Sequence, residues 1–309
     1  MSEQRKAYLY AMAAVLLWST VASAFKLSLR YLDCPQLLLY SSVVATVLLG
    51  AILAVTGKLG HVFPCSWREC LKSAGLGFLN PFLYYAVLFK AYDLLPAQVA
   101  QPLNYTWAIA LTLLSIPILK QRIGARDIAG GLVSYAGVLV ISTRGDVFSL
   151  SVASPTGVLL ALGSTVVWAL YWIYNIKDDR DPAVRLFMNF VFGLPVVFVY
   201  CVVFSELRVA NPLGLVGASY IGVVEMGIAF VMWLSALRLS ENTAKVGNLI
   251  FISPFVSLFF IRALVGEEIL TATVLGLVLV VAGIAVQRVG RRTAPEIDGG
   301  QRRPPHGGI

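Results

Sequence analysis

The stretch from Pro212 to Ala236 reads PLGLVGASYIGVVEMGIAFVMWLSA and contains one charged residue, Glu225, near its centre. A helix of about 20 mostly apolar residues spans the hydrocarbon core of a bilayer. The stretch therefore predicts a transmembrane helix that carries a carboxyl group close to the middle of the membrane.

The rest of the chain is similarly apolar. Hydrophobic residues make up 58% of its 309 residues and charged residues 13%, whereas a soluble domain carries roughly a quarter charged residues. This composition argues against a soluble enzyme, a nucleic-acid-binding protein or a secreted disulfide scaffold. The net charge of +8 then indicates basic cytoplasmic loops. The four cysteines lack zinc-ligand spacing, and we interpret them as apolar filler.

Ten apolar runs are long enough to cross the bilayer as helices, which predicts an all-α polytopic membrane protein. They cover residues 7–27, 35–56, 71–92, 96–118, 126–142, 156–176, 184–204, 212–236, 244–263 and 270–287. The first run ends near Ala22-Ser23-Ala24, which imitates a signal-peptide cleavage site. Its apolar length and the nine later runs favour an uncleaved first helix.

The basic residues predict the orientation. With the N-terminus inside, 18 of the 24 Lys and Arg residues fall in inner segments. Because Lys and Arg are in excess on the cytoplasmic side, we expect both termini in the cytoplasm. The protein is then a multi-pass protein of the inner (plasma) membrane. The tail, residues 289–309, is rich in Arg, Pro and Gly, and we expect it to be disordered.

The chain also matches itself at a nearly constant offset. Ala97-Gln98-Val99 aligns with Ala244-Lys245-Val246, 147 residues later. We therefore divide the chain into a first five-helix repeat, residues 1–146, and a second, residues 147–288. A unit of five spans crosses the membrane an odd number of times, so its copy is inverted. Inverted repeats are typical of transporters; a duplication that only enlarges the helix bundle is the alternative.

These features resemble the drug/metabolite transporter superfamily, in particular its ten-helix EamA-type members. The pattern from Trp18 to Phe25-Lys26 is similar to that family's Trp…Lys signature. The segment from Leu249 to Glu267, with Ser253-Pro254 inside it, is similar to the Pro-containing ninth helix and its Gly-Glu ending. The resemblance covers about residues 7–288 and implies transport of a small organic molecule.

Two shorter stretches refine this comparison. Asn104-Tyr105-Thr106-Trp107 resembles the fourth helix of the aromatic amino acid exporters. The first half ends in Lys120-Gln121-Arg122, where the family pattern has Gly-Glu. The role of that turn in the first half is therefore open.

Polar side chains form continuous faces on three of the expected helices, because residues three, four or seven apart share a face. We expect these faces to line a cavity that binds substrate; hydrogen bonds between helices, with no ligand, are the alternative. The candidates are Ser23 and Lys26 on the first helix, Gln101 and Tyr105 on the fourth, and Trp168, Tyr171 and Asn175 on the sixth. The repeat offset adds Asn248, which pairs with Gln101.

Glu225 is the sharpest candidate. An ionised group in the middle of a membrane costs about 2.5–3.5 kcal/mol, so it faces protein or water or is protonated. The repeat alignment places Asn80 opposite Glu225, and we expect both to face a central cavity. Glu225 then binds the amine of a substrate or carries a proton. A neutral Glu225 that is hydrogen-bonded to a neighbouring helix is the alternative.

The sequence contains no nucleotide-binding loop and no metalloprotease or serine-hydrolase motif in a plausible setting. We therefore expect no cofactor and a secondary transporter that exports a small organic metabolite by alternating access, with amino acids as the leading substrate. Efflux of a drug-like cation is the near alternative. An intramembrane enzyme needs paired carboxylates or a nucleophile with a base, and a structural membrane protein has no need of polar faces.

The expected partners are a small-molecule substrate and the lipid bilayer, with proton coupling left open and nucleic acid excluded. The chain is expected to act as a monomer or a homodimer. Small residues on the fifth and tenth helices, such as Gly137 and Gly283, are suited to close helix packing or dimer contacts.

Overall fold

The computed structural model describes residues 2–63, 65–119, 124–147, 154–176, 178–240, 246 and 248–288, and every regular element in these ranges is helical. The tail beyond residue 288, the Lys120-Gln121-Arg122 turn and Lys245 lie outside the described residues.

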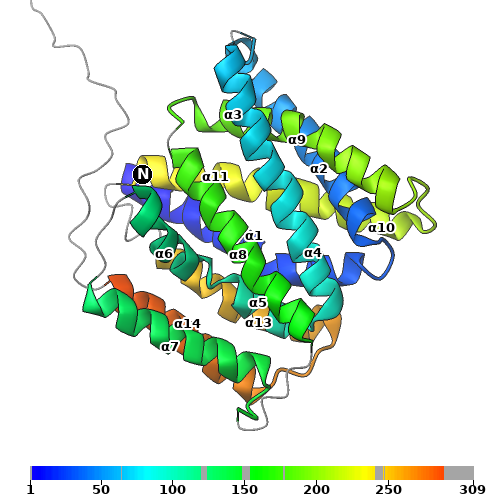
Figure 1. Cartoon of the computed structure of the whole chain (residues 1–309). Coiled ribbons are helices and arrows are strands. Elements are labelled where there is room, and N and C mark those ends of the chain that lie inside the picture. Colours follow the sequence, from blue (N-terminus) through cyan, green and yellow to red (C-terminus); the bar gives the residue numbers. More distant parts are fainter. Residues whose placement is uncertain are drawn as a thin grey trace, which may run out of the picture.

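We call each run of one or more consecutive helices that traverses the bundle once a passage, and the first half has five of them. Their helices are labelled in Figure 1. Three passages are single helices: α1 (Glu3–Ser28), α2 (Cys34–Val55) and α7 (Ala125–Ser142). The third passage is interrupted and consists of α3 (Trp67–Gly77), the π-helical turn η2 (Phe78–Leu83) and α4 (Tyr84–Leu94). The fourth consists of α5 (Ala97–Asn104) and α6 (Trp107–Leu119). A short 3-10 helix, η1 (Leu59–His61), lies between α2 and α3.

The second half repeats this pattern. Its single helices are α8 (Pro155–Ile176), α9 (Pro182–Phe204) and α14 (Thr271–Arg288). The eighth passage joins α10 (Pro212–Tyr220), the π-helical η3 (Ile221–Ile228) and α11 (Ala229–Leu239). The ninth joins η4 (Asn248–Ile252), α13 (Ser253–Phe260) and η5 (Ile261–Val265). Of the described helices, five are by length and composition apolar enough to cross a membrane, and three shorter apolar ones accompany them. The predicted polytopic helical fold is confirmed.

The helix contacts made by one half have counterparts made by the corresponding helices of the other half. α1 packs against α11 as α8 packs against α4, and α2 packs against η3 as α9 packs against η2. α2 also contacts α9, and α7 contacts α14. Equivalent helices thus meet equivalent neighbours, which is the arrangement predicted for two inverted five-helix repeats.

The interrupted passages have a local cause in the first half. Asn80 in η2 has the non-helical angles φ −147° and ψ 117°, and the cis-bonded Pro81 follows it. Proline has no N–H and cannot donate to the helical ladder. In the second half, η3 places Glu225 at the equivalent position. η3 contains no residue with non-helical angles, and Pro212–Leu239 runs as one continuous helix with a π-helical centre. The irregular backbone of the bundle interior therefore lies at Asn80, whose side chain is buried by protein.

Equivalent bonds tie α2 and α9 to loops at opposite ends of the bundle. Asp33 caps α2 and accepts a hydrogen bond from Ser205, while Asp181 caps α9 and forms an ion pair with Lys58, with 2.7 Å between Nζ and Oδ2. Burial alone would raise the pKa of Asp181, but hydrogen bonds from Lys58 and from two backbone N–H groups of α9 outweigh it and lower the pKa. Each half therefore supplies one anchor to the other.

The cysteines fall into two pairs. Cys34 and Cys201 are buried in the core, as expected for apolar filler. Cys65 and Cys70 are only half-buried at the start of α3, and their Sγ atoms lie 2.8 Å apart. The filler interpretation therefore does not hold for Cys65 and Cys70, which the fold brings into contact.

Glycines bring α7 and α14 together along one edge of the bundle (Figure 1). A Cβ atom added to Gly137 would lie 2.4 Å from the carbonyl oxygen of Gly276, and one added to Gly283 would lie 2.3 Å from that of Gly130. Only residues without a side chain allow this approach. The small faces predicted for dimer or packing contacts are thus used inside the chain.

This contact gives a stability prediction. Gly137→Val is expected to lower the free energy of unfolding by about 1–3 kcal/mol, because the added side chain forces two helix backbones apart. Gly163→Val is the matched control, since a Cβ at Gly163 has no neighbour within 4 Å, and it is expected to change stability by less than about 0.5 kcal/mol. Thermal unfolding in detergent measures both, and equal midpoints would contradict the packing argument.

Candidate substrate cavity

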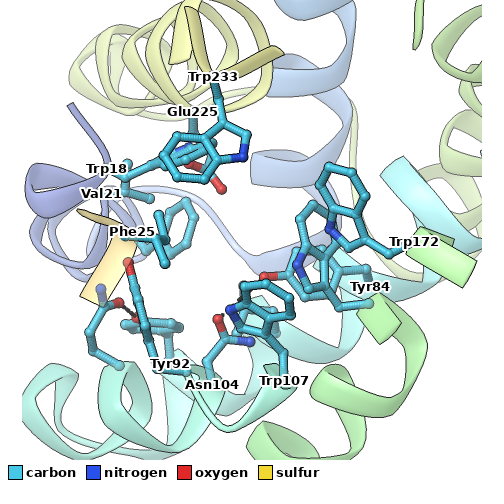
Figure 2. A pocket seen from close by; sticks show the side chains of 15 residues that line it. Trp18, Val21, Phe25, Tyr84, Tyr92, Asn104, Trp107, Trp172, Glu225 and Trp233 are labelled. Atoms are coloured by element: carbon cyan, nitrogen blue, oxygen red, sulfur yellow. Dashed lines mark hydrogen bonds between the residues drawn. The ribbon is translucent and has the colours of Figure 1, made fainter. Parts of the chain in front are cut away.

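A cavity lies between the two halves, with Glu225 of η3 in its wall (Figure 2). It contains about 690 Å³ of empty space, including its open mouth. Nine of its fifteen lining residues are aromatic. The complete lining is Trp18, Val21, Phe25, Tyr84, Leu88, Tyr92, Gln101, Asn104, Tyr105, Trp107, Trp168, Trp172, Glu225, Trp233 and Ile250.

The aromatic walls form a connected set of rings. Trp168 stacks on Tyr84 with ring centroids 4.5 Å apart and an interplanar angle of 27°. Trp18 is the counterpart of Trp168 in the first half, and its ring centroid lies 5.5 Å from that of Trp233. Ring pairs at these separations are stabilising and restrict each other's orientation. The cavity therefore presents fixed π faces to a ligand.

Glu225 is the one charged side chain among the described residues that line the cavity. It is buried in η3, and its Oε1 accepts a hydrogen bond from the Tyr85 hydroxyl at 3.0 Å. Its Oε2 is also buried and has no hydrogen-bond partner within 3.5 Å in the described part of the chain, although the Trp18 indole lies beside the carboxyl group. A buried oxygen without a partner is costly, so this atom is a strong acceptor for an ammonium group or a proton.

A second unpaired group belongs to the same cavity. Trp172, on α8, has a buried Nε1–H that finds no acceptor within the described ranges. Figure 2 shows Trp172 and Glu225 on different walls of the cavity. The cavity thus offers one free acceptor, which is acidic, and one free donor, which is neutral.

Asn104 lines the cavity, and both polar atoms of its side-chain amide are hydrogen-bonded to the protein. Its Nδ2 donates to Ser164 Oγ at 3.0 Å, and its Oδ1 accepts from the Tyr84 hydroxyl at 3.3 Å. Gln101 likewise accepts from the Tyr92 hydroxyl. These bonds fix the polar part of the α5 wall.

The predicted site residues divide into two groups. Glu225, Gln101, Tyr105 and Trp168 line the cavity, whereas Ser23, Lys26, Tyr171, Asn175 and Asn80 do not. The side chain of Asn248 lies outside the described residues, although Ile250 of the same turn lines the cavity.

The helix phase explains most of the difference. On α1 the cavity face is Trp18, Val21 and Phe25, one residue out of phase with the predicted polar face. One residue corresponds to about 100° around a helix. Ser23 is accordingly buried among helices, and Lys26 donates to the carbonyl oxygens of Tyr92 at 2.7 Å and Leu95 at 2.8 Å.

On α8 the predicted face only partly coincides with the cavity face. Trp168 and Trp172 face the cavity, while Tyr171 and Asn175 are buried beside it. Tyr171 accepts a hydrogen bond of 3.4 Å from Asn189 on α9. Asn80, on η2 packed against α9, is fully buried with both polar atoms unpartnered among the described residues. The expectation that Asn80 shares the cavity with Glu225 is therefore corrected.

Sequence reasoning missed most of the aromatic lining. Phe25, Tyr84, Tyr92 and Trp233 line the cavity but are not among the predicted site residues. The available signal was compositional: the chain has six tryptophans, and five of them line this one cavity.

Comparisons with known proteins agree with this architecture. The EamA-like transporter family matches residues 5–143 and 155–288. The chain is similar to an uncharacterized transporter of Archaeoglobus fulgidus, with 26% identity over 90% of this chain and 96% of the relative. It is also similar to the aromatic amino acid exporter YddG of Ancylobacter novellus, with 25% identity over 91% of this chain and 96% of the relative.

A solved crystal structure has the same fold. It superposes with a TM-score of 0.65 and 21% sequence identity, and the match covers 91% of this chain and 96% of the other. At this identity the likeness concerns the fold alone.

Proposed function

Because the chain belongs to the EamA-like transporter family, we propose that it is a secondary transporter that exports amino acids from the cell by alternating access. In this proposal the repeats 1–146 and 147–288 move against each other around the cavity. The protein lies in the plasma membrane with both termini in the cytoplasm.

The observation that carries this proposal is the pair of unpartnered groups in the cavity. Glu225 Oε2 is an acidic acceptor and Trp172 Nε1–H is a neutral donor. An amino acid has the complementary groups, since its ammonium donates and its carboxylate accepts. The aromatic walls offer a surface for a flat side chain, and a cation over a ring gains about 0.5–2 kcal/mol.

Glu225 also gives the cycle a way to couple to protons. A carboxylate in the middle of the bundle binds either a proton or an ammonium group. Because each neutralises the single negative charge of Glu225, the proton and the substrate bind to it in turn. Export of substrate in exchange for a proton then needs no second acidic site. Within the described lining, no other acidic side chain competes for this role.

Efflux of organic cations is the second candidate, and one observation favours it. No Lys or Arg side chain is among the described cavity-lining residues. Lys26, the one basic residue among the predicted site residues, instead binds backbone carbonyl oxygens of α4 and the turn after it. A substrate carboxylate would therefore meet only neutral donors.

A set of four related substrates tests these candidates in proteoliposomes, with and without a pH gradient. Phenylalanine carries both charged groups, phenethylamine lacks the carboxylate, phenylpropionate lacks the ammonium, and a quaternary aromatic ammonium carries a fixed charge. We expect transport of phenylalanine and none of phenylpropionate. Transport of the two cations without phenylalanine would support the second candidate instead, and protein-free liposomes give the background.

A further inference from the structure

One end of the bundle is closed by a seam of hydrogen bonds between the two halves. The seam joins the α4–α5 turn of the first half to residues 266–270, which connect η5 to α14 in the second half. It lies one helical turn from the cavity wall, because Gln98 in the seam and Gln101 in the wall are both on α5.

Glu267 caps α5 from a distance of 170 residues in sequence. Its Oε1 accepts the backbone N–H of Ala97 at 2.7 Å, and its Oε2 accepts that of Gln98 at 3.0 Å. The N-cap residue of α5 is Pro96, which provides no side-chain cap. The first N–H groups of a helix need acceptors, and the positive end of its dipole favours an anion. The Glu267 carboxylate meets both requirements.

Gln98 completes the seam with its side chain. Its Nε2 donates to the carbonyl oxygen of Glu268 at 2.7 Å. Its Oε1 accepts from the backbone N–H of Leu270 at 2.9 Å and from the Thr273 hydroxyl at 3.1 Å. One amide side chain thus links α5 to the connecting segment and to the first turn of α14.

Lys26 acts on the other side of the same turn. Its ammonium donates to carbonyl oxygens in the last turn of α4 and at its C-cap, Leu95, whereas Glu267 accepts from the first N–H groups of α5. A cation at a helix C-terminus and an anion at a helix N-terminus both stabilise the helix ends. The two charges therefore hold the α4–α5 turn from both sides.

The sequence differs at the positions of the first half and second half that correspond to the two seam residues. At the repeat offset of 147, Glu267 corresponds to Lys120 and Gln98 corresponds to Lys245. A lysine side chain has no acceptor atom when charged, so it cannot cap a helix N-terminus. The sequence therefore does not repeat the Glu267 carboxylate at the corresponding position.

We propose that Glu267 and Gln98 form the gate at this end of the cavity, and that the Glu267 carboxylate holds the gate closed. This inference rests on the proposed transport function, since alternating access requires the halves to separate here. Opening breaks the two bonds to α5 and frees its N-terminus, and closing restores them.

Thiol accessibility tests the gate without any substrate. The four native cysteines are replaced by Ala, and Val21→Cys places one thiol on the cavity wall. A membrane-impermeant thiol reagent is then added to either face of oriented vesicles. We expect Glu267→Gln to raise the labelling rate from the face that bears residues 266–270 by about 5- to 30-fold. Glu267→Asp, which keeps the charge, is expected to give a smaller rise.

Glu268→Gln is the matched control, because Glu268 joins the seam through its backbone carbonyl oxygen. It is expected to leave the labelling rate unchanged. An unchanged rate in Glu267→Gln, in protein that elutes as a single species like the parent, would overturn the gate. Since labelling needs no substrate, a failure of the proposed amino acid transport leaves this result interpretable.

Discussion

Glu225→Gln is expected to weaken substrate binding by about 10²- to 10³-fold, equivalent to roughly 3–4 kcal/mol. The amide keeps the size of the side chain and the acceptor for Tyr85, but it loses the charge that meets a substrate ammonium. Losing one partner of a buried charged pair has an effect of this size. Equilibrium binding of the transported substrate in detergent measures it directly.

The stability of the same variant separates this explanation from misfolding. An uncharged amide is less costly to bury than a carboxylate with an unpaired oxygen. Glu225→Gln is therefore expected to unfold at the same temperature as the parent or higher. Glu206→Gln makes the same chemical change on an exposed loop and is expected to alter neither property. Undiminished binding in Glu225→Gln would show that this carboxyl group does not contact the substrate.

Tyr85→Phe is expected to lower the free energy of unfolding by about 1–3 kcal/mol, because it removes the hydroxyl that donates to Glu225 Oε1 at 3.0 Å. Tyr85 is completely buried, so water does not replace the lost donor. Chemical denaturation or thermal unfolding in detergent measures the change.

Tyr84→Phe is the matched control for this prediction. It removes the neighbouring hydroxyl, which donates to Asn104 at 3.3 Å and does not touch Glu225. In the Glu225→Gln background, the Tyr85→Phe effect is expected to shrink while the Tyr84→Phe effect stays the same, since only the first pair interacts. If the effect of Tyr85→Phe on the free energy of unfolding were the same in the parent and in Glu225→Gln, Tyr85 would not hold Glu225 in place.

The transmembrane fold could be predicted from the sequence because it depends on length, apolarity and repetition. The runs 35–56 and 184–204 correspond closely to α2 and α9, since continuous apolar stretches leave a helix few alternatives in a membrane. The π-helical turns could not be located in this way. Pro81 marks η2, but η3 contains no proline and continues the helix without a break, so the sequence carries no local signal for it.

The cavity was harder to predict than the fold. Ser19, Ser23 and Lys26 share a face on α1, but polar groups in a membrane also bond within and between helices. Ser19 does so: its hydroxyl donates to Val15 O at 2.7 Å, and its Oγ lies 3.2 Å from Ser253 Oγ. The true lining is mostly aromatic, and helical periodicity cannot distinguish a ring that packs in a core from one that faces a cavity. Glu225 could be singled out because a lone carboxyl group in an apolar stretch needs an explanation.

The placement of the tryptophans has a practical consequence for the study of this protein. Five of the six indoles surround the cavity, and the remaining one, Trp67, is exposed at the start of α3. Indole emission responds to the polarity of its surroundings, so the natural fluorescence of the chain originates mainly from the place where a ligand would bind. Ligand binding can therefore be followed by the intrinsic tryptophan fluorescence of the unlabelled protein. The substitution Trp67→Phe removes the emission that does not come from the cavity.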